Sequence, residues 1–293
     1  MTVRIRTQRA AEEQPAGLSV SLTEVGEEPG HEVSRSRSIL EMRVDATSYE
    51  DATTQIITWA RSSLSRYVCV AAVNNVMEAH DDAHFMRVMN QADLVTPDGM
   101  PLVWGLRLLG VEGQTRVYGP DLTPSILDAA EKEGLTVGFY GGAPNVLGAL
   151  VAEARRRWPD LKIAYAYSPP YRELTSEEDG QIVRTIDASG VKILFVGLGC
   201  PRQENWMASH RGQVEAVMVG VGAAFDFLAG MKKQAPPSLQ KAGLEWLFRL
   251  ATEPRRLAKR YLRQNPRFTM LFGAQLIRAR VGRHVRSRRK ETS

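Results

Sequence analysis

The fold is decided by Val191-Lys-Ile-Leu-Phe-Val-Gly-Leu-Gly-Cys-Pro-Arg-Gln-Glu204. The first six residues are apolar apart from one lysine, which is typical of a strand buried on both faces of a sheet. Glycines end this strand, and a helix-like segment follows through Trp206. A buried strand, a glycine turn and a helix together form the repeating unit of a parallel α/β sheet.

The same alternation recurs along the chain on both sides of this stretch. Short apolar runs predict strands over 67–73, 92–95, 135–140, 161–165, 191–196 and 214–221. Helix-like segments lie between them, including 102–109, 146–158 and 176–188, the last with Ser176 and Asp179 as an N-terminal cap signal. The sequence therefore predicts an α/β fold, a Rossmann-like and mostly parallel sheet with helices on both faces.

Composition divides the chain into three segments. Residues 1–37 are rich in Glu, Ser, Arg and Gly without a sustained period, so we expect a disordered leader. Residues 38–240 carry the strand and helix pattern of the α/β domain. The strands stop after Ala235-Pro-Pro237, and residues 241–293 predict a basic helical appendage with a helix start at Glu253-Pro254.

Hydrophobic residues make up 43% of the chain and charged residues 24%, as in ordinary globular proteins. Mean hydropathy is −0.26, and no apolar run approaches the roughly 18–20 residues that cross a bilayer. The polar N-terminus lacks the apolar centre of a signal peptide, so we expect a cytoplasmic protein.

The net charge of +5 is concentrated near the C-terminus. The cations there are Arg278, Arg280, Arg283, Arg286, Arg288, Arg289 and Lys290. A basic tail is often merely solvated, but it also favours nucleic acid or anionic lipid, and composition alone does not choose between them.

Cysteines and histidines show no metal-binding pattern. Cys69 and Cys200 lie beside apolar runs without a CxxC partner, so we expect both to be packing residues. The five histidines show no HExxH spacing. We therefore expect no metal and no cofactor.

Small and polar residues follow the predicted strands, where ligands bind in open α/β sheets. These segments are Asn74-Asn75, Pro97-Asp98-Gly99, Gly119-Pro-Asp121, Gly141-Gly142, Gly197-Leu-Gly199 and Gly220-Val-Gly222. Glycines at a strand end leave backbone N–H groups open to a phosphate, and a following helix N-terminus adds a favourable dipole. Each segment can also be a plain turn.

Asp98 and the segment around Gln203 each allow two interpretations. The Asp98 carboxylate can act as a base on a substrate hydroxyl, or it can cap the following helix or form an Asx turn before Gly99. A helix N-terminus would make it a weaker base. Gln203 and Glu204 can contact a nucleotide base and ribose, or they can simply begin a charged helix.

Two other function classes fit parts of the sequence. Gly-x-Gly occurs twice after strands, as in nicotinamide enzymes, but neither copy continues as GxGxxG. A non-catalytic nucleotide- or nucleic-acid-binding module would use the basic end, but the stacking aromatics expected for single strands are missing.

The motifs together resemble the WecG/TagA/CpsF glycosyltransferases, from about Ile39 to Tyr261. Their order is Asp98-Gly99, Arg116-Val-Tyr-Gly119 with Asp121-Leu122, Gly141-Gly142, Gly197-Leu-Gly-Cys-Pro-Arg-Gln-Glu204, Val219-Gly-Val-Gly-Ala-Ala-Phe-Asp226, Ala229-Gly230, Ala235-Pro236 and Gly243-Leu-Glu-Trp-Leu-Phe-Arg249 with Glu253-Pro-Arg255. The GxGxPxQE and GLEWxxRLxxEP segments are the specific ones, whereas glycine pairs are common.

This resemblance implies an inverting, metal-independent transferase at the inner face of the cell membrane. The donor would be a UDP-sugar carrying N-acetylmannosamine, its uronic acid, glucose or glucuronic acid. The acceptor would be an undecaprenyl-diphosphate-linked saccharide in surface polysaccharide synthesis. Asp98 matches the family's catalytic base, and arginines of the appendage would neutralise the diphosphate charge.

The residues expected to contact substrate are Asn74, Asn75, Gly99, Arg116, Gly119, Asp121, Gly141, Gly142, Gly199, Arg202, Gln203, Glu204, Asp226, Arg249, Arg255, Arg256 and Arg260. The sequence departs from the family pattern after the first strand, where family members often carry a Thr-x-Asn segment. Here Ala71-Ala-Val-Asn74-Asn75 lacks the threonine, and its register against the motif is open by a residue or two.

The appendage also predicts binding to an anionic membrane surface, since Leu247, Phe248, Tyr261 and Phe268 lie among cations. The alternative is that these apolar side chains pack on the α/β core. A homo-oligomer is compatible with the sequence, and no nucleic acid partner is expected.

Overall fold

The computed structural model describes residues 36–241 and 243–291, without the side chains of 237, 241, 256 and 281–291. The first strand begins at Ser36, two residues inside the leader expected over 1–37, and the rest of that leader lies outside the described residues. The side chains of the last four basic-tail residues, and of Arg283, lie outside them too.

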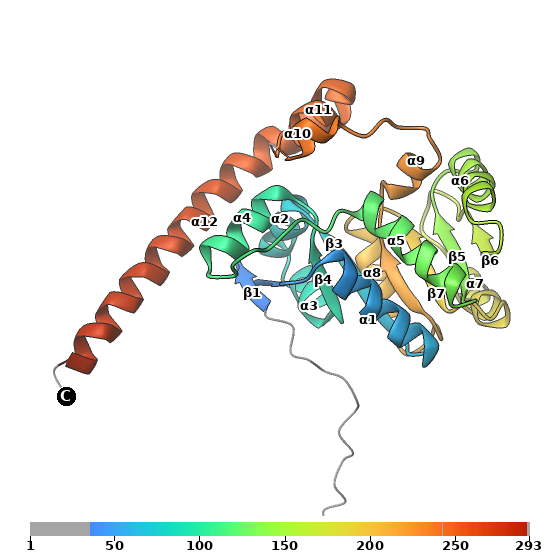
Figure 1. Cartoon of the computed structure of the whole chain (residues 1–293), viewed down its shortest axis with the longest axis horizontal. Coiled ribbons are helices and arrows are strands. Elements are labelled where there is room, and N and C mark those ends of the chain that lie inside the picture. The colour runs from blue at the N-terminus through green and yellow to red at the C-terminus, as the bar shows by residue number, and fades with distance from the viewer. Residues whose placement is uncertain (1–35, 242, 292–293) are drawn as a thin grey trace, which may run out of the picture. The chain divides into compact units, whose positions relative to one another are not determined.

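A six-stranded parallel sheet forms the centre of the α/β part (Figure 1). Its strands are β3 (Arg66–Ala71), β4 (Leu94–Pro97), β5 (Thr136–Gly141), β6 (Lys162–Tyr167), β7 (Ile193–Gly197) and β8 (Val217–Gly220). Their order across the sheet is β4-β3-β8-β7-β5-β6, and every neighbouring pair is parallel. The predicted parallel α/β fold is confirmed, with strand ends shifted by up to three residues.

Helices cover both faces of the sheet. Alternate strand residues point to opposite faces, so a strand of apolar residues presents an apolar surface on each side. Leu194 and Val196 of β7 pack into the apolar core on one face, whereas Ile193 and Phe195 pack into the core on the other. Residues of α2 (Val73–Asp81), α3 (Ala83–Gln91), α4 (Met100–Leu108), α7 (Ser176–Ala188) and α8 (Arg202–Ser209) join the first core. Residues of α1 (Tyr49–Arg61), α5 (Gly119–Lys132), α6 (Pro144–Arg157) and α9 (Ala224–Leu228) join the second.

The α7 helix has the bounds predicted from the sequence, but its cap is different. Thr175 is the N-cap, and its hydroxyl accepts a hydrogen bond from the Glu178 backbone N–H at 3.2 Å. The Glu178 carboxylate accepts one in return from the Thr175 N–H at 2.9 Å. The prediction of Ser176 with Asp179 was therefore one residue late, because this reciprocal capping box begins at the threonine.

An antiparallel hairpin precedes the α/β part and was not predicted. It joins β1 (Ser36–Ile39) to β2 (Met42–Asp45). The two turn residues, Leu40 and Glu41, have positive φ angles of 49° and 71°. These are neither glycine nor asparagine, so the sequence carries none of the usual signals of such a turn.

The C-terminal appendage is helical, as expected, and its long helix packs on the core. It comprises α10 (Pro237–Lys241), α11 (Glu245–Thr252) and α12 (Pro254–Glu291). Figure 1 shows α12 running beside α4 and α2. Phe268 and Phe272 are buried, and the Gln275 side chain accepts a hydrogen bond from Leu40 N–H and donates one to the Ser38 carbonyl.

This packing changes the expectation for the apolar residues of the appendage. Phe268 is buried against the core, so its ring is not available to a membrane, whereas Tyr261 is half-buried and Leu247 is exposed. Within the described residues, every helix is too short or too polar to cross a bilayer.

Candidate active site

Asp98 lies where the loops after β3 and β4 meet. Ala71 and Pro97 are paired at the ends of these adjacent parallel strands, and the Asp98 backbone N–H donates to the Ala71 carbonyl at 2.9 Å. A Cβ atom on Gly99 would stand 3.4 Å from Ala72, an ordinary van der Waals distance, so the two loops lie next to each other at one site.

The Asp98 side chain does not cap α4. The N-cap residue is Gly99, and no side chain accepts a hydrogen bond from the first turn of the helix. The carboxylate instead accepts a hydrogen bond from Arg116, between Nη2 and Oδ1 at 3.0 Å. The helix-cap interpretation of Asp98 is therefore wrong, and its carboxylate is available for other chemistry.

Arg116 joins Asp98 to the appendage. Its Nη1 atom is 2.6 Å from Oε2 of Glu245 on α11, and its Nε atom donates to the Asp98 backbone carbonyl. The guanidinium also lies over the Tyr118 ring, 3.8 Å from the centroid. One arginine thus holds two carboxylates, one from the sheet edge and one from the appendage.

The surroundings of Asp98 make its carboxylate a stronger base than an exposed one. Burial raises the pKa of Asp98, the negative charge of Glu245 raises it further, and Arg116 acts in the opposite direction. The side chain is nevertheless 21% exposed, so a substrate hydroxyl can reach it. A positioned carboxylate of raised pKa is what a general base requires.

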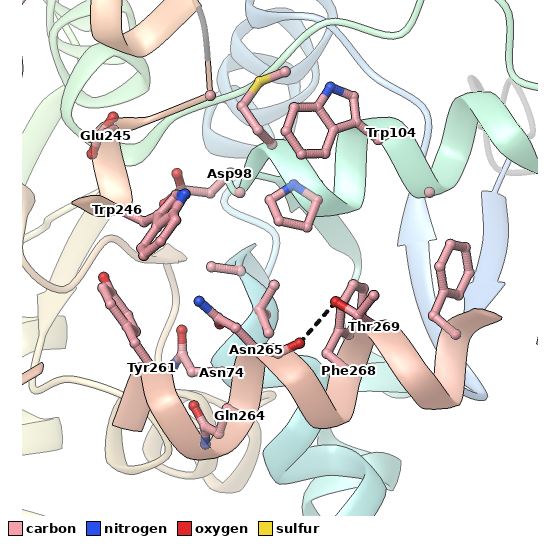
Figure 2. Close-up of a pocket in the computed structure, with 18 of the residues that line it drawn as sticks. Asn74, Asp98, Trp104, Glu245, Trp246, Tyr261, Gln264, Asn265, Phe268 and Thr269 are labelled. Atoms are coloured by element: carbon pink, nitrogen blue, oxygen red, sulfur yellow. Dashed lines mark hydrogen bonds between the residues drawn. The ribbon is translucent and has the colours of Figure 1, made fainter. Parts of the chain in front are cut away.

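A pocket of about 560 Å³ opens beside Asp98. It lies between the loops after β3 and β4, the helix α4 and the appendage helices α11 and α12. Figure 2 shows Tyr261 and Asn265 pointing from α12 into this space, with Asp98 and Trp246 across from them. A pocket of this volume is within the usual range for small-molecule sites.

Six of the predicted site residues line this pocket. They are Asn74, Asp98, Gly99, Arg116, Arg249 and Arg260. The remaining predicted residues lie elsewhere, and their surroundings fall into three groups.

A buried hydrogen-bonded network contains Asn75, Gln203 and Glu204. The Glu204 Oε1 atom accepts from Asn75 Nδ2 and from Gln203 Nε2, each at 3.0 Å. Gln203 Oε1 accepts from the Gly199 N–H at 3.2 Å, and Asn75 Oδ1 accepts from the Ala72 N–H at 3.1 Å. The network therefore connects the loop after β7 to the loop after β3. Burial raises the pKa of Glu204 to about 7.

Two of the predicted glycines are explained by chain packing. Gly141 has a φ of 114°, and a Cβ atom there would stand 2.7 Å from the Gly197 backbone. Gly142 has a φ of 71°, and a Cβ atom there would stand 3.2 Å from the Phe225 ring. Gly199 also has a positive φ, of 79°, but the space beside it is open.

The last group lies on α5, α8, α9 and α12. Gly119 is buried in the first turn of α5. Asp121 accepts from the Tyr49 hydroxyl at 3.4 Å, Asp226 forms an ion pair with Lys232 at 3.5 Å, and Arg202 lies over the Tyr171 ring. Arg255 is exposed on α12, and the side chain of Arg256 lies outside the described residues.

Glu245 is the main site residue that sequence reasoning missed. It belongs to the GLEW segment, but its partner Arg116 is 129 positions away, so spacing gives no hint of their contact. The sequence signal for Glu245 is its position beside an apolar helical stripe. A charge buried at such a position is costly unless it is paired, so the position suggests a partner. Trp104 of α4 also lines the pocket without having been singled out.

Cys69 and Cys200 are free thiols, the first buried and the second half-buried, as expected of packing residues. In the part of the chain that the structure describes, no three His, Cys, Asp or Glu side chains gather in a metal-binding arrangement.

Comparison with known proteins identifies related sequences. The model of the glycosyl transferase WecG/TagA/CpsF family matches residues 37–282. A Bacillus spizizenii protein, an N-acetylglucosaminyldiphosphoundecaprenol N-acetyl-beta-D-mannosaminyltransferase, is 35% identical over 180 residues, which is 61% of this chain and 68% of the relative. The family model, over residues 37–282, spans the elements that surround Asp98, from β1 into α12. The chain belongs to the WecG/TagA/CpsF family of glycosyltransferases.

Proposed function

We propose that this glycosyltransferase moves N-acetylmannosamine from a UDP-sugar to N-acetylglucosamine carried on undecaprenyl diphosphate. The activity for which the Bacillus spizizenii relative is named supports the transferred sugar and the acceptor. The observation that carries the proposal is the Asp98 carboxylate, which has a raised pKa and opens into a pocket that arginines of the appendage also line.

In the proposed reaction, Asp98 takes the proton of the acceptor hydroxyl. The hydroxyl oxygen then forms a bond to the anomeric carbon of the donor, on the face opposite to the phosphate. The bond between that carbon and the phosphate oxygen breaks, and UDP leaves with the electron pair. One displacement of this kind inverts the configuration at the anomeric carbon.

Arg249 and Arg260 supply positive charge where the diphosphates would lie. Both line the pocket beside Asp98, and neither forms an ion pair that the described residues record. Guanidinium groups bind phosphate oxygens through paired hydrogen bonds. They therefore provide the charge neutralisation that a metal ion provides in other transferases, which supports the metal-independent mechanism.

We assign the buried network of Asn75, Gln203 and Glu204 to the donor side. It fixes the Gly199 N–H and the start of α2, so it sets the relative position of two strand-end loops. The other predicted residues from Gly119 to Asp226 remain proposed donor contacts. The enzyme would act at the inner face of the cell membrane, where such a lipid-linked acceptor is available.

The test is acceptor-dependent release of UDP. The enzyme would be given each of four donors, the UDP forms of N-acetylmannosamine, its uronic acid, glucose and glucuronic acid, with and without undecaprenyl-diphosphate-linked N-acetylglucosamine. We expect UDP release with UDP-N-acetylmannosamine only when the acceptor is present, and no change on adding a chelator. Absence of UDP release with all four donors would refute the proposed function. Loss of UDP release on adding the chelator would refute only the metal independence. Thermal stabilisation by each donor gives an independent ranking of their affinities.

A further inference from the structure

The pocket beside Asp98 changes from polar to apolar along its length. Its polar side chains gather around Asp98, on the loop after β4 and on α11, and include Arg116 and Glu245. From there, α4 and α12 both lead away, and their pocket-lining side chains become mostly apolar. The apolar ones are Trp104, Leu108, Phe268, Phe272 and Leu276, and Thr269 is the polar exception.

The apolar part is a groove between the two helices. A Cβ atom on Gly105 of α4 would stand 3.2 Å from the Phe272 ring, so the two helices touch there and close the bottom of the groove. Phe268 and Phe272 stack with their centroids 5.6 Å apart and form part of the lining. At 1.5 Å per residue, Leu276 lies about 22 Å along α12 from Tyr261.

The walls of this groove expose large apolar side chains. Trp104 is 45% exposed and Leu108 is 55% exposed, and both lie on one face of α4 because they are four residues apart. Leaving adjacent large apolar groups in water is unfavourable, and such patches commonly mark a surface that another apolar group covers. The exposed apolar side chains of the groove therefore favour a hydrocarbon ligand.

The two ends of the pocket together identify the kind of ligand. The polar end, with Asp98, Arg249 and Arg260, suits a sugar hydroxyl and a diphosphate, and the apolar groove suits a hydrocarbon chain. A polyprenyl-diphosphate-linked sugar combines a polar head and an apolar tail of these kinds. Soluble sugars and nucleotides have no counterpart for the groove.

We propose that the groove between α4 and α12 binds the first isoprene units of the acceptor's polyprenyl chain. This proposal takes the identity of the acceptor from the proposed function, and it adds the position of the acceptor's lipid chain on the enzyme. The chain would enter from the membrane along α12, pass Leu276 and Leu108, and place the diphosphate and sugar beside Asp98. The remaining isoprene units would stay in the bilayer, because a pocket of about 560 Å³ holds only a short part of the acceptor.

The test compares acceptors that differ only in chain length. N-acetylglucosamine would be linked through diphosphate to chains of two or of three isoprene units and assayed with the full-length enzyme. We expect the wild-type KM to fall for the longer chain, since each buried methylene contributes binding energy. Leu108→Ser and Leu276→Ser should raise the KM for the longer chain by about tenfold and leave the KM for the UDP-sugar unchanged.

Met231→Ser is the matched control. Met231 lies between α9 and α10, is 52% exposed and does not line the pocket. It should leave both KM values unchanged. Equal KM values for the two chain lengths in the wild type would overturn the proposal, and so would an effect of Met231→Ser as large as that of Leu108→Ser.

A binding measurement separates this proposal from the proposed function. Farnesyl diphosphate and inorganic diphosphate would be titrated against the enzyme while tryptophan fluorescence is followed, with Trp104→Phe to identify the responding residue. We expect a response from Trp104 to the prenyl compound alone. Binding without any sugar transfer would refute only the proposed function. Transfer without dependence on chain length, or no Trp104 response, would refute the groove.

Discussion

Arg116 cannot neutralise both of the carboxylates that it contacts. Asp98 and Glu245 lie on opposite sides of one guanidinium, at 3.0 and 2.6 Å, so the three groups together carry a net negative charge when both acids are ionised. That excess charge favours the protonated form of Asp98, which is why Glu245 raises its pKa. A residue of the appendage thus adjusts the strength of the proposed base.

The first prediction concerns Glu245→Gln and the pH dependence of kcat/KM. Removing the charge lowers the pKa of Asp98, so the loss of activity at acid pH should move to lower pH. The plateau rate should also fall, because a weaker base removes the proton less readily, but by less than the roughly 100-fold expected for losing the base. Glu253→Gln is the control, since Glu253 pairs with Lys232 and not with Arg116. An unchanged acid limb in Glu245→Gln would contradict this account.

Glu204 gives a second prediction, on stability. Burial raises its pKa from 4.5 to about 7 in the folded protein. Between these pH values the folded state holds a proton that the unfolded state has released, so the free energy of unfolding falls as pH rises through this window. The effect is complete above about pH 7 and amounts to about 3 kcal/mol at most.

Glu204→Gln removes this titration while keeping an oxygen that can accept from Asn75 and Gln203. Urea unfolding of both proteins at pH 5 and pH 8 should show the variant gaining stability relative to the wild type at the higher pH. Other titrating groups are common to both proteins and cancel in the difference. If the free energy of unfolding changed with pH in the same way in both proteins, a buried and titrating Glu204 would be ruled out.

At the scale of elements, the strand-end glycines divide into two kinds. Gly141 has no room for a side chain, since its Cβ would stand 2.7 Å from the Gly197 backbone. Gly199 has open space and only a positive φ. We expect Gly141→Ala to lower the free energy of unfolding by more than about 3 kcal/mol, and Gly199→Ala by only about 1–2 kcal/mol. Equal losses in urea unfolding would contradict the packing explanation of Gly141.

The elements that the sequence predicted are those whose signal is local. The strands β3, β4, β5, β7 and β8 are apolar runs that are buried on both faces, and α7 carries a regular helical pattern, so each is recognisable within its own residues. The β1–β2 hairpin was missed because its four-residue strands turn through Leu40 and Glu41, which are not typical turn residues. Local pattern gives no information about such a turn.

The candidate site was predictable only in part, for a related reason. Asp98 and Arg116 belong to short motifs, and both were selected. Whether Asp98 caps a helix or faces a pocket depends on where Arg116 and Glu245 lie in space, and that is a long-range property. The same holds for Gln203 and Glu204, which the motif singles out but which are buried beneath the loops.

At the scale of the whole molecule, α12 connects the active site to a surface suited to membranes. Leu262, Met270 and Ile277 are 73%, 75% and 65% exposed, and their spacing of eight and seven residues places them on one side of the helix. Exposed cations accompany them, namely Arg255, Lys259, Arg260, Arg263, Arg278 and Arg280. An apolar stripe among cations suits an anionic bilayer surface.

A further prediction follows for vesicle binding. The double variant Leu262→Glu with Met270→Glu should lose most of its co-sedimentation with phosphatidylglycerol vesicles, and binding of the wild type should weaken at high salt. Tyr171→Glu is the control, because Tyr171 is 96% exposed on the loop before α7, outside the appendage. Undiminished binding of the double variant would show that α12 is not the membrane-facing element.

The central claim is that Asp98 removes the proton from the acceptor hydroxyl, and Asp98→Asn tests it most directly. The substitution keeps the size of the side chain and its oxygen acceptor for Arg116, so the protein should stay folded and still bind the UDP-sugar. The measurement is the rate of UDP release with saturating donor and lipid-linked acceptor. We predict a loss of at least about 100-fold; a rate within a few-fold of the wild type, in a folded variant, would contradict the account.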